Sequence, residues 1–354
     1  MYSESDIDGA VAAGAITRDA ANALRDHIAA NHATPAVDEE HFRLLTGFND
    51  IFVSIAAAAV LVGMAWLGQS IWLPLSGTLV AVTAWGLAEY FTRRRRMALP
   101  SILLLLAFIG GVAAAQVGLV VVNADAIQAW GKANFPDHAE PVIGTIAALI
   151  AVVTAGAAWL HWRRFMVPIT VAAGAVAVVA VMLALFIGYV PAAKNYIYAP
   201  VLVAGLAMFA VAMRWDMSDR ERRTRRSDVA FWLHLAAAPM IAHALFQMLG
   251  VFEAPIGVGM AVIVIALYVA FAFVALAVDR RALLVSSLAY VLYAMYSLFQ
   301  GAGAVELAWA FTALVIGSAL LLLSAFWQPT RARVVGMLGG LSEKLPPVGR
   351  VAHA

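Results

Sequence analysis

The polar side chains best placed to bind or move a ligand lie in one apolar stretch, residues 229–249. Pro239 removes a backbone hydrogen bond there and should kink a helix. His243 and Gln247 share one helix face, whereas His234 lies on the opposite side. A histidine on a kinked helix can line a substrate path or take up a proton near neutral pH. The alternative is that these side chains only form hydrogen bonds between helices.

A second set of candidates is a line of tyrosines, Tyr290, Tyr293 and Tyr296, which ends near Gln300. Their spacing places them along one side of a helix, where they could line a cavity for an aromatic or sugar-like ligand. Tyrosines in such a position also pack against neighbouring helices, with their hydroxyls bonded between helices or at the membrane interface. Both interpretations stay open.

The longest loop expected outside the membrane, residues 123–141, contains Asp137, His138 and Glu140. These types can bind a metal, but no second histidine is nearby. An interfacial helix anchored by Trp130 is the better interpretation.

Motifs of known chemistry are missing from the sequence. The chain has no cysteine, no phosphate-binding glycine loop, no His-Glu-x-x-His motif and no nucleophile elbow. The sequence therefore predicts no metal, no cofactor and no enzymatic activity.

Composition places all these residues in a membrane. Of 354 residues 64% are hydrophobic and 12% charged, against roughly 45–50% and 25% in soluble domains. A spanning helix needs about 20 apolar residues, and the first and sixth candidates are barely long enough. The predicted fold is all-α, a polytopic membrane protein of about ten transmembrane helices. The candidate spans are 51–67, 71–91, 99–122, 142–160, 165–190, 198–213, 229–249, 256–278, 283–299 and 305–327.

The positions of the arginines predict the orientation. Basic residues follow every even-numbered span, whereas the odd-numbered spans are followed only by Lys132 and Lys194. Because basic loops stay in the cytoplasm, we expect both termini there. The residues that determine this topology most strongly are Arg93, Arg94, Arg95, Arg96, Arg163, Arg164, Arg280 and Arg281.

The arginine-rich run 214–226 could also bind anionic lipid headgroups. Acidic residues between the arginines dilute its charge, so topology control is the alternative. The run holds a single aromatic residue, Trp215, and not a series that could stack on successive bases, so no binding of nucleic acid is expected.

Two predictions concern local packing. Gly110, Ala114 and Gly118 recur every four residues, beside Gly111 and Ala115, a spacing that allows helices to approach closely. Glu89 stands one turn before Arg93, as in a helical ion pair.

The polar N-terminus predicts a small helical module. Gly14 can end a first helix and Thr17 can cap a second one. Two such helices cannot fold alone, so residues 1–36 should dock on the loops, on a second copy in a homo-oligomer, or on a cytoplasmic partner. The expected domains are 1–48, a cytoplasmic helical module and linker; 49–327, the ten-helix transmembrane domain; and 328–354, a cytoplasmic amphipathic tail.

Short motifs give a resemblance. The turn Gly14-Ala15-Ile16-Thr17, the segment 41–50 (HFRLLTGFND) and the arginine-rich turns resemble bacterial multi-pass inner-membrane proteins of unknown function that have a two-helix N-terminal module. The resemblance implies a bacterial inner (plasma) membrane location and transfers no catalytic or binding residue. In helix count and orientation alone, the chain is also similar to the drug/metabolite transporter superfamily.

Two functions fit these observations. The first is a small-molecule or lipid permease, flippase-like, with a path lined by the seventh and ninth spans. The alternative is a non-transporting membrane scaffold or sensor whose N-terminal module recruits a partner. The number of spans exceeds what anchoring needs, which favours transport.

The orientation can be tested directly, because the chain lacks cysteine. We expect Ser218→Cys to resist a membrane-impermeant maleimide in intact cells and Ala133→Cys to react, since the two positions lie on opposite sides. Labelling after lysis is the control. Labelling of residue 218 from outside would contradict the predicted threading.

Overall fold

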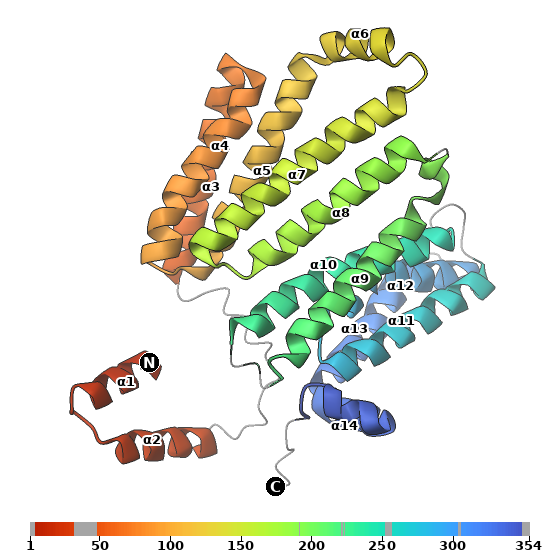
Figure 1. Cartoon of the computed structure of the whole chain (residues 1–354). Helices are drawn as coiled ribbons and strands as arrows, with labels where there is room; N and C mark the ends of the chain where they lie inside the picture. The colour runs from red at the N-terminus through yellow and green to blue at the C-terminus, as the bar shows by residue number, and fades with distance from the viewer. Residues whose placement is uncertain are drawn as a thin grey trace.

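A computed structural model describes residues 4–31, 48–190, 192–220, 222, 224–251, 257–303 and 306–348. Within these residues the chain forms helices joined by short turns and no strand (Figure 1). The prediction of an all-α polytopic membrane protein is confirmed.

Nine helices in the described part of the chain are long and apolar enough to cross a membrane. A further helix, α4 (Leu73–Ala88), has 16 residues and runs directly into a π-helix, η1 (Glu89–Arg94), so the two together cover the second predicted span. The nine are α3 (Phe48–Ile71), α5 (Ala98–Val122), α7 (Ala139–Phe165), α8 (Ile169–Tyr189), α9 (Tyr198–Met217), α10 (Arg225–Met248), α11 (Val258–Val278), α12 (Ala282–Gly301) and α13 (Ala308–Ala325).

Two spans are longer than the sequence predicted. Helix α3 has 24 residues and α9 has 20, whereas the apolar stretches 51–67 and 198–213 were barely sufficient. Both helices continue into polar residues, and the buried Asp50 and Asp216 stand in these extensions. Hydropathy underestimates a span where the protein itself surrounds the polar end of the helix.

The spans form two groups that follow one another in sequence (Figure 1). Helices α3, α4, α5, α7 and α8 make the first half, and α9 to α13 make the second half. In the first half each spanning helix packs against the next, whereas in the second half α10 packs against α9 and α12, and α11 packs against α12. The halves meet where α8 contacts α9 and α10. The contact with α10 involves Ala172 on α8 and Val229, Leu233 and Ala237 on α10.

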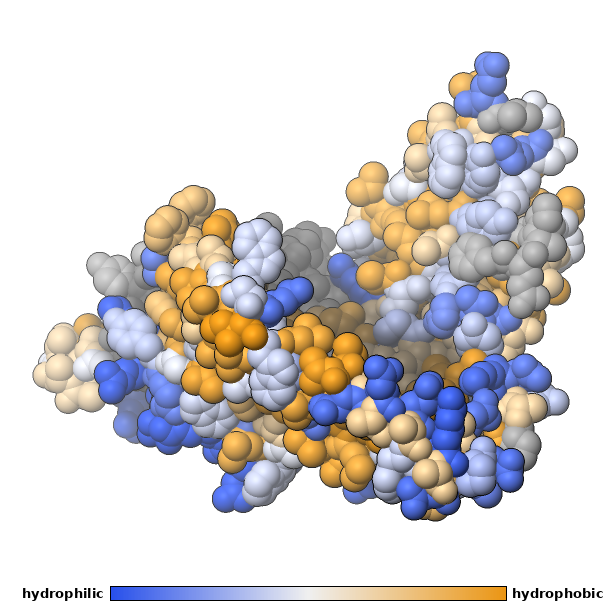
Figure 2. Space-filling model, turned by 90° about the horizontal axis from the view of Figure 1, so that it is seen from above, coloured by the Kyte–Doolittle hydropathy of each residue, from blue (hydrophilic) through white to orange (hydrophobic). Residues whose placement is uncertain are grey.

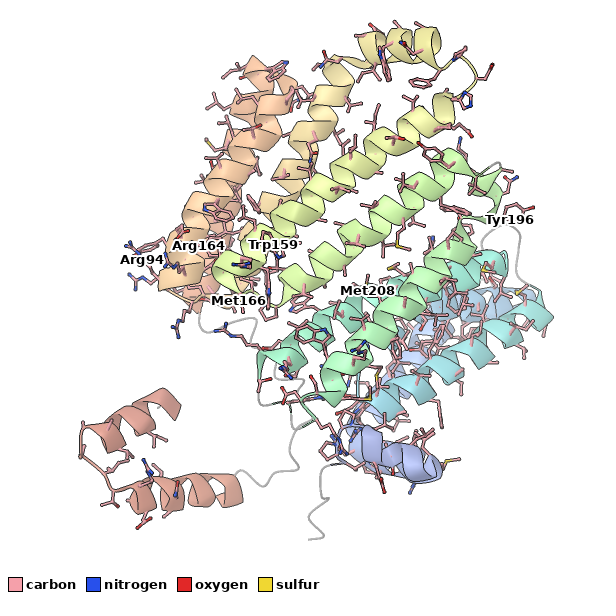
Figure 3. The ribbon with its side chains drawn as sticks, in the orientation of Figure 1. Arg94, Trp159, Arg164, Met166, Tyr196 and Met208 are labelled. Atoms are coloured by element: carbon pink, nitrogen blue, oxygen red, sulfur yellow. The ribbon has the colours of Figure 1, made fainter. Side chains whose placement is uncertain are left out.

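Four hairpins, α4–α5, α7–α8, α9–α10 and α11–α12, have arginines in the connecting turn or in the last helical turn before it. We call the end of the molecule that carries these turns the basic end. Arg94 and Arg164 lie there, while Tyr196, in the turn before α9, lies at the opposite end (Figure 3). The short helix α6 (Ala124–Asn134) lies in the loop where an interfacial helix was predicted, and it has no buried residue.

Glycines allow the tightest hairpins to close. A Cβ added to Gly111 of α5 would lie 2.7 Å from the carbonyl oxygen of Gly77 on α4, and one on Gly118 would lie 2.9 Å from Pro74 Cα. Nothing lies within 4 Å of a Cβ at Gly110. The predicted small-residue seam is confirmed at Gly118 but was wrong at Gly110, because the helix face turned to α4 is one residue further along.

The ends of the described chain add three short helices. In the N-terminal module, α1 (Glu4–Ala12) and α2 (Arg18–Asn31) are separated by Gly14 at φ 70°, and the Thr17 hydroxyl accepts a hydrogen bond from the Ala20 amide. Near the C-terminus, α14 (Trp327–Met337) packs through Trp327 and Val334 against the basic end of α11. The predicted amphipathic tail thus covers protein with its apolar side.

The glycine seam can be tested with a matched pair. Gly111→Val should place side-chain atoms into the α4 backbone and lower thermal stability, by about 1–3 kcal/mol as for overpacked cores. Gly110→Val adds the same side chain to the same helix without a contact and should leave the melting temperature of the purified protein nearly unchanged. Equal losses in both variants would refute the seam.

Candidate functional site

Helix α10 brings His243 next to one of the predicted tyrosines. His243 Nδ1 and the Tyr290 hydroxyl on α12 are 2.6 Å apart. Tyr290 is buried and stacks on Phe246 with ring centroids 4.1 Å apart, and Tyr198 of α9 meets the His243 ring edge-on at 5.8 Å. The His243 side chain itself is exposed, so one ring edge is fixed by the protein and the other is open to a ligand.

The other residues of the predicted path do not join the contact between His243 and Tyr290. Gln247 is half-buried one turn beyond His243, and Pro239 is exposed one turn before it. Tyr293 is half-buried in the apolar cluster between α10 and α12. Tyr296 accepts a hydrogen bond from Gln300 and stacks on Trp309 of α13 at 4.2 Å. The three tyrosines therefore contact different neighbours and do not form one ligand surface.

His234 lies on the other side of α10, in a buried ion cluster. Its Nε2 is 3.0 Å from Asp216 Oδ2 on α9, and Arg280 at the end of α11 contacts the same carboxylate at 2.6 and 3.1 Å. Arg280 also donates to the Ser227 carbonyl. All three ionisable side chains are 4% exposed or less. We call Asp216, Ser227, His234 and Arg280 the Asp216 cluster; it joins three helices and excludes His234 from the surroundings of His243.

A second carboxylate at the basic end, Asp279, joins the second half to the C-terminal segment. Its oxygens lie 2.9 Å from Arg222 Nη1 and 2.9 Å from Trp327 Nε1, and Arg331 Nε is 3.4 Å away. Arg331 is 1% exposed and donates to the carbonyls of Pro346 and Pro347. These contacts bind the turn after α9, the end of α11 and the C-terminal segment to each other.

These two ion clusters were not predicted from the sequence. The sixth span was expected to end at residue 213, and Asp216 counted only among the acidic residues that dilute the charge of the run 214–226, so its burial was not predicted. Arg280 was predicted only as a topology determinant. The usable signal was the pairing of opposite charges at the ends of neighbouring spans, since charges there need partners.

The first half has its own ion pair at the basic end. Glu89 of η1 contacts Arg93 at 3.3 Å, as predicted, but Arg164 of α7 makes two shorter contacts to the same carboxylate, at 2.6 and 2.9 Å. Both partners are partly exposed. Arg163 instead lies over the Trp159 ring at 5.1 Å, and Arg281 over Trp327 at 4.5 Å. Arg94, the last residue of η1, and Arg95 and Arg96, which follow it, are exposed.

His161, near the basic end of α7, was not singled out from the sequence either. This side chain is fully buried among Trp85, Phe108 and Phe165. Its Nδ1 is 3.3 Å from the Thr170 hydroxyl on α8, and its Nε2 has no hydrogen-bond partner. Aromatic faces surround this ring, so it belongs to the packing of the first half.

A cavity of about 630 Å³ lies between the halves, among α5, α7, α8 and α10. The surface seen from above is hydrophobic over broad areas and has a hollow between two parts of the molecule (Figure 2). The cavity walls include Leu106, Ile150, Val176, Trp232 and Ala236. On α10, Trp232 and Ala236 share the face that continues through Pro239 to His243.

The loop residues considered as metal ligands are spread out. Glu140 pairs with Lys194 at 3.0 Å, while Asp137 and His138 are exposed. Across the described ranges, no three His, Asp or Glu side chains come together as a metal site requires.

Comparisons of the chain with protein families, curated proteins and solved structures gave no match. The resemblance to inner-membrane proteins with a two-helix module therefore stays a prediction.

The buried and exposed ion pairs should differ strongly in their contribution to stability. Asp216→Asn removes the carboxylate that Arg280 contacts in a buried site, where breaking a pair costs about 3–5 kcal/mol. Glu89→Gln makes the equivalent change in a partly exposed pair, worth about 0–1 kcal/mol. Thermal unfolding of the two purified proteins measures the difference. Similar melting temperatures in both variants would show that the Asp216 cluster does not hold the second half together.

Proposed function

We propose that the protein is a permease, flippase-like, which moves a small molecule or a lipid across the bacterial inner membrane. The basic end lies in the cytoplasm in this proposal, and both termini are on that side, since basic loops are retained there. The observation that carries the proposal is His243, a polar side chain exposed on a spanning helix and fixed by Tyr290. Polar groups at such positions are costly and mark substrate paths in membrane proteins.

The form of α10 supports this role. Pro239 stands inside the helix one turn before His243. Because proline has no N–H, the Leu235 carbonyl lacks its usual helical partner. Broken or weakened spanning helices are tolerated where the backbone borders protein or a cavity, as at transporter binding sites.

The division into two halves also fits transport. Transporters commonly work by rocking one bundle against another around a central site. Here the Glu89–Arg164 pair lies within the first half, and the Asp216 cluster lies within the second half. Each half can therefore move as a unit, and α8 and α10 form the contact about which they would move.

The exposed arginines support a contact with anionic lipid. Arg94, Arg95 and Arg96 are exposed together at the basic end, and juxtamembrane arginines are attracted to anionic headgroups by about 1 kcal/mol each. These contacts would hold the first half at a fixed depth during transport.

The transport role depends on His243. His243→Leu removes the polar group exposed on α10 together with its hydrogen bond to Tyr290, so we expect transport to fall about tenfold or more, as for the loss of a polar group that lines a substrate path. The measurement is rescue of the uptake or export phenotype of a deletion strain, with the abundance of each variant in the membrane determined by immunoblot. Tyr290→Phe should cause a smaller loss.

His138→Leu makes the same substitution in the exposed loop and serves as the control. It should rescue like the wild type. Full rescue by His243→Leu at normal abundance would remove the proposed path.

A further inference from the structure

The cavity between the halves has walls that suit only an apolar occupant. Apart from Trp232, the polar side chain in its lining is Thr154, whose hydroxyl donates to the Ile150 carbonyl of its own helix at 2.7 Å. A polar ligand would lose its water there without gaining hydrogen bonds. A hydrocarbon chain has no hydrogen bonds to lose, so it can enter the cavity without this cost.

The cavity is open to the surroundings of the spanning helices. Leu106 of α5 and Val176 of α8 both line it and are about half exposed, at 52% and 46%. Around spanning helices at this depth the solvent is lipid hydrocarbon. An occupant can therefore enter sideways from the bilayer without crossing water.

Small side chains keep the space open. Six alanines line it on α7 and α8, and Ala113 and Ala236 line it on α5 and α10. Larger residues at these positions would let the helices fill the gap with their own side chains. The volume of about 630 Å³ lies within the range of ligand sites, roughly 300–1,000 Å³.

We propose that this groove binds a hydrocarbon chain of a membrane phospholipid. The chain lies against Trp232 and Ala236 of α10, and the same helix face leads through Pro239 to the exposed His243. The occupant is thus apolar along the groove and meets a polar group at one end. As a statement about substrate this inference rests on the proposed function, and it makes the substrate a lipid-like amphiphile.

Chain binding can be measured without transport. Purified full-length protein is stripped of lipid, incubated with dioleoyl-phosphatidylglycerol and examined by native mass spectrometry. We expect the wild type to retain one lipid and Ala173→Phe, which fills the groove from α8, to lose it. Val178→Phe adds the same ring to the same helix at a position that is 51% exposed and outside the lining. This control should retain lipid.

A second measurement covers the case in which Ala173→Phe does not fold, judged by circular dichroism and gel filtration. A phospholipid with a brominated chain quenches tryptophan fluorescence on contact. Quenching of the wild type should decrease in Trp232→Phe, which removes the tryptophan of the groove. Trp159→Phe, which removes a tryptophan that is 59% exposed and outside the lining, reports lipid on the outer surface.

Three results would overturn the inference: a wild type that retains no lipid, an Ala173→Phe variant that is folded and retains lipid like the wild type, or quenching unaffected by Trp232→Phe. Lipid retention without transport by the wild type would leave the groove standing and remove the proposed function. Transport by a wild type that retains no lipid would overturn lipid binding in the groove and leave the proposed function standing.

Discussion

Charged side chains near a membrane need partners of opposite charge. In this protein such ion pairs at the basic end join two hairpins to earlier spans. Hydrocarbon provides no hydrophobic force between helices, so apolar spans need other reasons to pack in one arrangement. At the basic end, Arg164 reaches across to Glu89, and Arg280 reaches across to Asp216. In each case the arginine closes one hairpin and the acid stands at the end of an earlier span. The arginines that were predicted to orient the chain therefore also join each of these hairpins to a particular earlier span.

Within each hairpin, the two helices are also held together by close approach of their backbones. Gly77 and Gly111 bring α4 and α5 together, and Gly144 and Gly188 do the same for α7 and α8. Between the halves, alanines on α8 and α10 leave space in place of contact. Small residues thus bring two helices together where another helix backbone lies opposite, and they leave space where none does. The boundary between the halves is therefore less completely filled than the hairpins within them, as the proposed movement of the two bundles would require.

The sequence predicted the helical fold and the spans well, because a run of apolar residues has few other solutions in a membrane. The sequence did not predict features that depend on how a helix is rotated about its axis or on a partner that is distant in the sequence. The seam uses Gly111 and not Gly110, a difference of one residue that composition cannot resolve. His243 and Tyr290 were both singled out, but their contact depends on the packing of α10 against α12. Asp216 was missed because its partner Arg280 is 64 positions away.

The C-terminal segment has a consequence for biosynthesis. The Arg220 side chain donates to the Leu345 carbonyl, 125 positions later, and Arg331 donates to Pro346 and Pro347. While the ribosome is still adding α11 to α13, the Arg220 side chain in the turn after α9 lacks this acceptor, whereas Arg222 of the same turn has Asp279 as a partner once α11 is made. The second half can therefore reach its final form only after residue 347 has emerged. Insertion of the spans into the membrane therefore comes before the C-terminal segment forms its hydrogen bonds with their basic ends.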